Sequence, residues 1–357
     1  MTPARLPPRA AALRIVMRGC RRFARPLLLC AFAVAAVAAA PDGARAAQSA
    51  VPGEATRPDP VSAARLLDLD PESLSANDVA TVLAGVPAPR IVLLQGSFAP
   101  VTMDPFARFL IAMGYPEDRI RSPRDGAYSA SSFADSGQLA GTLAWYYETE
   151  GMRPLVIGHS QGGMLAIRVL HELAGAFTDA IPVWNPMTDA AERRTAIVDP
   201  LSGALRPVVG LQLPYVAAIA TGKLMRILLG QWTMIPRLRR IPDSVEEFTG
   251  FAIEWDPIAG QFPGAEPYAA TGVATVRNVT LPVSYTHIGL PQAEQLAANA
   301  VTRAWIDAYA PGASGTAPIP ADVDTTNLIH AADIWHSVKK HWCSEARRLA
   351  VAQQGPR

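Results

Sequence analysis

The sequence is poor in cysteine and in charged residues for its length of 357. Only three cysteines are present, and Cys20 and Cys30 lie in an N-terminal segment that we expect to be removed, so Cys343 would have no partner for an intramolecular disulfide. No second apolar run is long enough and free enough of charge to span a membrane, which excludes a transporter or receptor. With 18% charged and 50% apolar residues, the composition is that of a compact globular enzyme.

The first 46 residues have the layout of a secretory signal peptide. Seven arginines precede an apolar run of 14 residues at 27–40, which is shorter than the roughly 20 residues that span a bilayer. A break at Pro41 and Gly43 then leads to the small-residue site Ala44-Arg45-Ala46. We expect cleavage after Ala46 or Ala47 and export to the periplasm or the medium, with an uncleaved N-terminal anchor as the alternative.

Removal of residues 1–46 also changes the charge of the chain. The segment holds eight arginines and one aspartate, so the formal net charge falls from +1 to about −6. A mildly acidic protein has no electrostatic reason to bind nucleic acid. We therefore expect no nucleic-acid partner, and the sequence leaves the oligomeric state open.

Apolar runs that alternate with helical patterns predict an α/β fold with a mainly parallel, doubly wound sheet and helices on both faces. The main domain is expected at residues 89–310, after an N-terminal lead-in at 47–88 that contains a short helix at 75–83. A Gly/Pro-rich hinge at 311–320 begins a C-terminal helical extension at 311–357. The expected strands are residues 90–94, a segment near Ile120, 154–157, 181–184, 250–253 and 273–279.

More than sixty residues separate the expected strands 181–184 and 250–253, which is too long for a bare loop. Residues 211–235 are strongly apolar with Lys223 and Arg226 interspersed, a pattern that predicts helices covering the sheet. We interpret residues 185–248 as an inserted helical lid that could touch a lipid surface transiently. The sequence equally favours a simpler interpretation, in which residues 211–235 only pack against the core.

The segment Leu155-Val156-Ile157-Gly158-His159-Ser160-Gln161-Gly162 carries the chemistry, because a strand runs into a helix through the pattern G-x-S-x-G. A serine hydroxyl is a poor nucleophile until a base accepts its proton and a tight strand-to-helix turn holds its oxygen exposed. Gly158 and Gly162 suit so tight a turn, and the helix that starts at Gln161 brings its positive end to a developing oxyanion. A simple helix cap is the alternative.

This segment, Gly-His-Ser-Gln-Gly at residues 158–162, resembles the elbow of the α/β-hydrolase family, and within it the lipase and esterase branch. The resemblance covers roughly residues 88 to 310. It implies an α/β-hydrolase fold and a triad whose members follow the chain order nucleophile, acid, histidine. Both partners of Ser160 are therefore sought downstream of it.

His287 and Asp256 are the partners that this order favours. His287 follows an expected strand and lies in a loop that looks like the family's histidine loop before the last helix. Asp256 follows the strand at 251–254 and lies 31 residues before His287, with Glu254 as a rival acid. Asp256 would accept the Nδ1 proton of His287 and stabilise the imidazolium. The helical spacing of the C-terminal histidines predicts instead a solvated face, without the pairing of a zinc site: His330, His336 and His341.

An oxyanion hole needs two backbone N–H groups aimed at the substrate's carbonyl oxygen. Gln161 is expected to supply one. The other should come from the loop after the first main strand, where Gln95-Gly96-Ser97 stands in place of the family's usual His-Gly pair, and this points to Ser97 or Phe98.

Together these features predict an exported serine hydrolase, an esterase or lipase, that acts on a small-molecule or lipid ester through an acyl-enzyme. No metal and no organic cofactor are implied. An acyltransferase with the same triad is the alternative enzyme, since sequence does not reveal how a site excludes water. A non-catalytic binding protein that keeps the fold is the alternative of another class.

Overall fold

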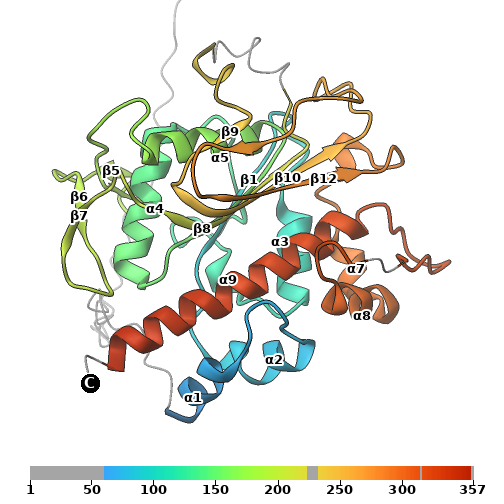
Figure 1. Ribbon diagram of the computed structural model, residues 1–357, viewed down its shortest axis with the longest axis horizontal. Coiled ribbons are helices and arrows are strands. Elements are labelled where there is room, and N and C mark those ends of the chain that lie inside the picture. Colours follow the sequence, from blue (N-terminus) through green and yellow to red (C-terminus); the bar gives the residue numbers. More distant parts are fainter. Residues whose placement is uncertain (1–59, 223–231, 314–315, 355–357) are drawn as a thin grey trace, which may run out of the picture. The chain divides into compact units, whose positions relative to one another are not determined.

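A six-stranded parallel sheet lies at the centre of the structure, with the strand order β12-β10-β8-β3-β1-β2 (Figure 1). The computed structural model describes residues 60–222, 232–313 and 316–354, so the predicted signal peptide lies outside the described residues. The strands are β1 (Ile91–Leu94), β2 (Ser129–Ala130), β3 (Leu155–His159), β8 (Leu213–Ile219), β10 (Val245–Ile253) and β12 (Thr275–Leu281).

Alternate side chains of the central strands enter two separate cores, one on each face of the sheet. In β3, Leu155 and Ile157 belong to one core, whereas Val156 between them belongs to the other. All five residues of β3 are buried. This is why the strand reads as a continuous apolar run in the sequence rather than as an alternating pattern.

Helices cover both faces of the sheet, as predicted (Figure 1). The first face carries α4 (Ser136–Glu150) and α5 (Gln161–Leu173). The predicted fold class, a doubly wound parallel sheet between helical layers, is confirmed, and the helix expected in the lead-in is present with Ser75 as its N-cap. The second face carries α1 (Pro60–Asp68), α2 (Ala76–Thr81), α3 (Asp104–Ala112), α7 (Glu294–Ala298), α8 (Ala300–Ala308) and α9 (Leu328–Gln354).

The segment interpreted as a helical lid, residues 185–248, differs from the prediction. Its residues Leu213–Ile219 form β8, a fully buried strand that pairs with β3 and β10 in the middle of the sheet. A short apolar run that is buried on all sides has the same pattern in a helix and in a strand, so periodicity could not separate them. Residues 223–231 lie outside the described residues.

Short two-stranded pairings make up much of the rest of this segment and of its surroundings. β4 (Trp184–Asn185) pairs with β5 (Ala190–Ala191), β6 (Ala196–Val198) with β7 (Leu205–Pro207), and β9 (Arg240–Ile241) with β11 (Ala269–Ala270). The strand expected at 181–184 is thus only β4, outside the central sheet. The strand expected near Ile120 is also wrong: a 3-10 turn (Glu117–Arg119) occupies that place, and β2 follows nine residues later as the sheet edge.

The long C-terminal helix α9 crosses the second face of the sheet, next to α1 and α8 (Figure 1). Its polar residues are buried against charged residues of the sheet, since Arg277 of β12 pairs with Asp333 at 2.7 Å and with Glu247 of β10 at 3.1 Å. His341 contacts Glu247 at 3.3 Å. The expectation of a solvated face for His330 and His341 is therefore wrong: both rings are buried, His341 against Glu247 of the sheet and His330 with its Nε2 atom 2.8 Å from the carbonyl of Leu290. No described helix is long and apolar enough to cross a membrane.

The chain changes direction between β1 and β3, where the sheet has its topological switch point. From β1 the chain moves outward to β2, then returns to β3 and continues through β8, β10 and β12 on the other side. In such sheets the ligand site lies beyond the carboxyl ends of the strands at the switch point. The loops that follow β1 and β3 are therefore the expected floor of the site, and these loops hold Gly96 and Ser160.

Candidate active site

Ser160 occupies the tight turn between β3 and α5. Its backbone has φ 54° and ψ −118°, a left-handed conformation that a residue with a side chain rarely adopts and that costs about 1–3 kcal/mol. The turn is held by hydrogen bonds, since the N–H of Ser160 donates to the carbonyl of Ile219 at 2.7 Å and the hydroxyl of Thr221 donates to the Ser160 carbonyl at 3.1 Å. This geometry turns the serine side chain out of the sheet edge.

Three glycines let the backbone pack closely around this turn. A Cβ at Gly158 would overlap the carbonyl of Gly162, and a Cβ at Gly162 would overlap the carbonyls of Leu94 and Gln95 at the end of β1. A Cβ at Gly163 would overlap the hydroxyl of Thr221. The glycines of the G-x-S-x-G pattern are thus required by the approach of backbone to backbone.

The structure brings Ser160, His287 and Asp256 into one chain of hydrogen bonds. His287 Nε2 lies 2.9 Å from Ser160 Oγ, and His287 Nδ1 lies 2.7 Å from Asp256 Oδ2. A carboxylate only accepts, so Nδ1 carries the proton and Nε2 has a free lone pair for the serine hydroxyl. This is the arrangement that a general base needs to take the proton of a nucleophilic serine.

Asp256 is held in place by its own short loop. It is almost fully buried, its second oxygen Oδ1 accepts the N–H of Ala259 at 2.9 Å, and its backbone pairs with Gln261. The rival acid Glu254 is exposed, and the hydrogen bond of His287 Nδ1 goes to Asp256. Between the two acids that the sequence offered, the geometry favours Asp256.

His159 is a member of the site that sequence reasoning did not single out. Its ring is buried, lies 5.1 Å from the ring of His287, and donates from Nε2 to the His287 carbonyl at 2.9 Å. Burial, followed by repulsion from His287, lowers the pKa of His159 to about 3. It therefore stays neutral and fixes the backbone of His287 without adding charge beside it.

The loop after β1 lies against the elbow, as the oxyanion-hole prediction requires. A Cβ at Gly96 would come within 3.3 Å of both the Ser160 Cβ and the His159 Nδ1 atom. Ser97 is the next residue, and Gln161 is the first residue of α5. Both predicted donors therefore belong to segments that border Ser160, and their role as donors stays a prediction.

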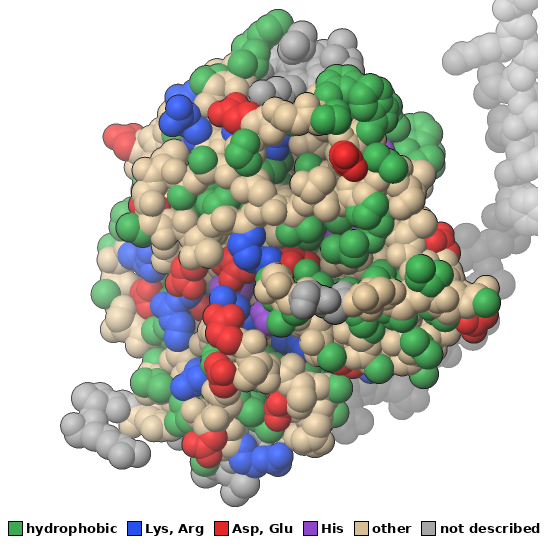
Figure 2. Space-filling model, turned by 45° about the vertical axis from the view of Figure 1, so that its right-hand side comes forward, with side chains coloured by type: hydrophobic (Ala, Val, Ile, Leu, Met, Phe, Trp, Pro, Cys, Tyr) green, Lys and Arg blue, Asp and Glu red, His purple; other side chains and the backbone are tan. Residues whose placement is uncertain are grey.

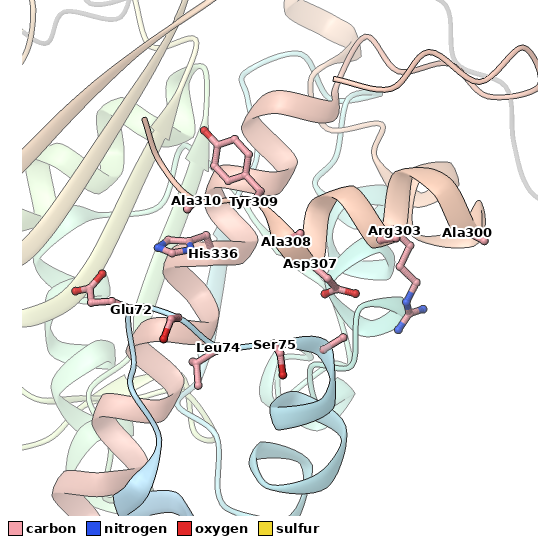
Figure 3. Close-up of a pocket in the computed structure, with 13 residues that line it drawn as sticks. Glu72, Leu74, Ser75, Ala300, Arg303, Asp307, Ala308, Tyr309, Ala310 and His336 are labelled. Carbon is pink, nitrogen blue, oxygen red and sulfur yellow. The ribbon is translucent and has the colours of Figure 1, made fainter. Parts of the chain in front are cut away.

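No metal-binding group accompanies this site: within the described ranges, no three His, Cys, Asp or Glu side chains are placed to hold an ion. A cavity of about 680 Å³ opens elsewhere, between the lead-in, α8 and α9 (Figure 3). Glu72, Asp307 and His336 line it together with small apolar residues, and no triad member does. The cavity is thus separate from the candidate active site.

Comparison with known proteins finds no matching family model and no matching curated protein. Solved structures of other proteins are similar in part. One is described as a YdeN-like hydrolase from Pectobacterium atrosepticum, with 15% identity over 62% of this chain and 97% of that chain, and a TM-score of 0.29. Another is RedJ with a PEG molecule bound in its active site, with 14% identity over 60% of this chain and 92% of that chain, and a TM-score of 0.27. With TM-scores this low, neither likeness bears on the activity of this chain.

Proposed function

We propose that this protein is an exported serine hydrolase that cleaves carboxylic esters through an acyl-enzyme on Ser160. The observation that carries the proposal is the continuous chain of hydrogen bonds from Ser160 through His287 to Asp256, at the carboxyl end of β3. This constellation is recognised by the geometry of its members, and it recurs on unrelated folds with the same roles.

The proposed reaction has two halves. In the first, Ser160 Oγ attacks the ester carbonyl while His287 Nε2 takes its proton, and the oxyanion is stabilised by the N–H groups of Gln161 and Ser97. The bond to the alcohol then breaks, and His287 returns the proton to the departing oxygen. In the second half a water molecule attacks the acyl-enzyme, His287 takes a proton from the water, and Ser160 is released with that proton.

Exposed apolar side chains around the triad support a lipid-like acyl group. Trp255 precedes Asp256 and packs on Phe262 with the rings 5.1 Å apart, and Ile288 follows His287. Phe98 is exposed on the loop after β1. Hydrophobic side chains gather at the upper right in Figure 2, the side on which the loops after β10 and β12 lie in Figure 1. Such patches mark binding surfaces for apolar ligands, so any contact with a lipid surface would use this rim.

The first test compares the mature wild-type protein with Ser160→Ala and with Ser202→Ala, a control serine on an exposed loop. Each is assayed on p-nitrophenyl esters from acetyl to palmitoyl. Ser160→Ala should lose nearly all activity and Ser202→Ala none. Addition of an alcohol acceptor separates hydrolysis from acyl transfer by the products formed. A folded wild-type protein that cleaves no ester in the series would contradict the proposal.

The second test concerns the acyl chain. Trp255→Ser should raise KM for palmitoyl and octanoyl esters about 5- to 20-fold and leave acetyl ester hydrolysis unchanged, because removing a contacting aromatic side chain costs about 1–2 kcal/mol of apolar burial. Val273→Ser is the control, since Val273 is also an exposed apolar residue but precedes β12, at the amino end of that strand and not at the carboxyl end where the triad lies. Equal effects on all chain lengths would argue against an acyl contact at Trp255.

A further inference from the structure

The loop that carries His287 has little support of its own. His287 begins a single 3-10 turn (His287–Gly289) that has no side-chain cap, and such turns have poor hydrogen-bond geometry. Within the loop, the N–H of Gly289 donates to the carbonyl of Thr286 at 3.0 Å and the N–H of Gln292 donates to the carbonyl of Gly289 at 2.9 Å. A carbonyl oxygen has two lone pairs, so donors from outside the loop can bind these and neighbouring carbonyls and fix the position of the loop.

Asn327, at the start of α9, supplies two of these donors. Its side-chain nitrogen lies 2.8 Å from the carbonyl of Gly289 and 2.6 Å from the carbonyl of Gln292. Asn327 is itself almost fully buried, and its own carbonyl accepts the N–H of Ala331 in the first turn of α9. One residue thus joins the beginning of α9 to the end of the turn that carries His287.

His330, one turn of α9 further on, supplies the third donor. Its Nε2 lies 2.8 Å from the carbonyl of Leu290, which can only accept, so Nε2 carries the proton. The ring is completely buried between aromatic neighbours, with Phe106 at 6.1 Å and Tyr285 at 5.9 Å between centroids. Burial lowers the pKa of His330 to about 4, which keeps the side chain neutral and its donor fixed.

A fourth contact ties the other end of the loop to the same helix. The backbone N–H of Ile329 donates to the hydroxyl of Tyr285 at 3.0 Å, and Tyr285 precedes His287 by two residues. Residues 285–292 are therefore bound to the first turn of α9 on both sides of the histidine. From the elbow side, His159 donates to the His287 carbonyl itself.

We propose that Asn327 and His330 are positioning residues of the active site, through which the C-terminal helix sets the place of His287 relative to Ser160. This inference rests on the proposed function. Proton transfer needs Nε2 within hydrogen-bond reach of Ser160 Oγ, and a displacement of about 1 Å in a catalytic group can cost about 100-fold in rate. The helix acts through the backbone of the loop and touches neither substrate nor the reacting atoms.

The experiment measures kcat and KM on p-nitrophenyl butyrate for Asn327→Leu, which keeps the branched shape of the side chain, and for His330→Leu, which keeps an apolar filling of the site; both remove the donors. We expect kcat to fall 10- to 100-fold with KM within about threefold. His330→Gln, which keeps an N–H donor, should recover part of the loss. Ser337→Ala is the matched control: Ser337 is buried on α9 and bonded to Glu247, so it tests a loosened helix away from the loop.

A double-mutant cycle separates positioning from general stability. In the His287→Ala background, Asn327→Leu should cause no further loss of the residual rate, because there is no base left to position. An equal loss of rate in both backgrounds would overturn the inference. It would also be overturned if Ser337→Ala and Asn327→Leu, with equal melting temperatures, lost kcat to the same extent. If Asn327→Leu does not fold, His330→Leu and His330→Gln carry the same cycle. Full activity of His287→Ala would instead refute the proposed function itself.

Discussion

Asp256→Asn should abolish nearly all esterase activity near neutral pH while the protein stays folded. Asp256 uses both oxygens, since Oδ1 accepts the N–H of Ala259 at 2.9 Å and Oδ2 accepts Nδ1–H of His287 at 2.7 Å. An asparagine has one acceptor and one donor group. Because the N–H of Ala259 can only donate, the amide oxygen must face it, and the amide NH₂ must then face His287.

This arrangement reverses the tautomer of His287. Nδ1 would have to accept from the amide, so the ring proton moves to Nε2, which then has no lone pair for the hydroxyl of Ser160. Loss of the correct tautomer costs about 10⁴-fold in kcat in enzymes with this triad, which corresponds to about 5.5 kcal/mol of transition-state stabilisation.

The assay is kcat/KM on p-nitrophenyl butyrate at pH 7.5, with the melting temperature recorded for each variant. Glu254→Gln is the matched control, because it makes the same carboxylate-to-amide change two residues away on an exposed side chain. We expect it to stay within about twofold of wild type. A Glu254→Gln variant that loses more activity than Asp256→Asn would refute the assignment of the acid, and an Asp256→Asn variant with a tenth or more of the wild-type rate would refute the tautomer argument.

Two further outcomes follow from the same geometry. Gly163→Ala should destabilise the protein by about 1–3 kcal/mol, because a Cβ at this position overlaps the hydroxyl of Thr221. Thr221→Ala in the same protein should recover part of this loss. A Gly163→Ala variant with the melting temperature of the wild type would contradict the prediction. The free energy of unfolding should fall by about 2 kcal/mol for each of His159 and His330 between pH 8 and pH 5. Their pKa values of about 3 and 4 keep both side chains neutral in the folded protein, whereas the same histidines in the unfolded chain take up protons below their ordinary pKa of 6.5. Urea titrations that give the same free energy of unfolding at both pH values would argue against buried neutral rings.

The strand-to-helix turn that holds Ser160, the proposed nucleophile, could be predicted from the sequence because the requirements of such a turn are local. A tight strand-to-helix turn needs small residues at fixed offsets, and Gly158 and Gly162 meet backbone carbonyls at those offsets in the structure. His287 and Asp256 could be chosen only with the chain order that the family resemblance implies, because the spacing of 31 residues between them says nothing of distance in space. Their approach depends on β10 and β12 being neighbours in the sheet.

The sequence-based prediction was wrong where the same pattern of apolar or polar residues is compatible with two different structures. Residues 213–219 are apolar and contain Pro214, which favours neither a helix interior nor a central strand, and only pairing with β3 and β10 decides the outcome. The polar residues of α9 likewise suggested a solvated surface, because the partners of His330 and His341 lie 40 and 94 residues away in the chain. Contacts at such separations leave no local signal in the sequence.

The histidines around the elbow differ in role because they differ in partner. His159 and His330 each face a backbone carbonyl, which accepts an N–H but gives an imidazolium little compensation for burial, so both pKa values fall far below the ordinary value. His287 alone among these three faces a carboxylate on one side and a serine hydroxyl on the other. In the proposed reaction, the charge that forms during acylation would therefore be carried by His287, and the two neutral rings would hold the backbone of its loop in place.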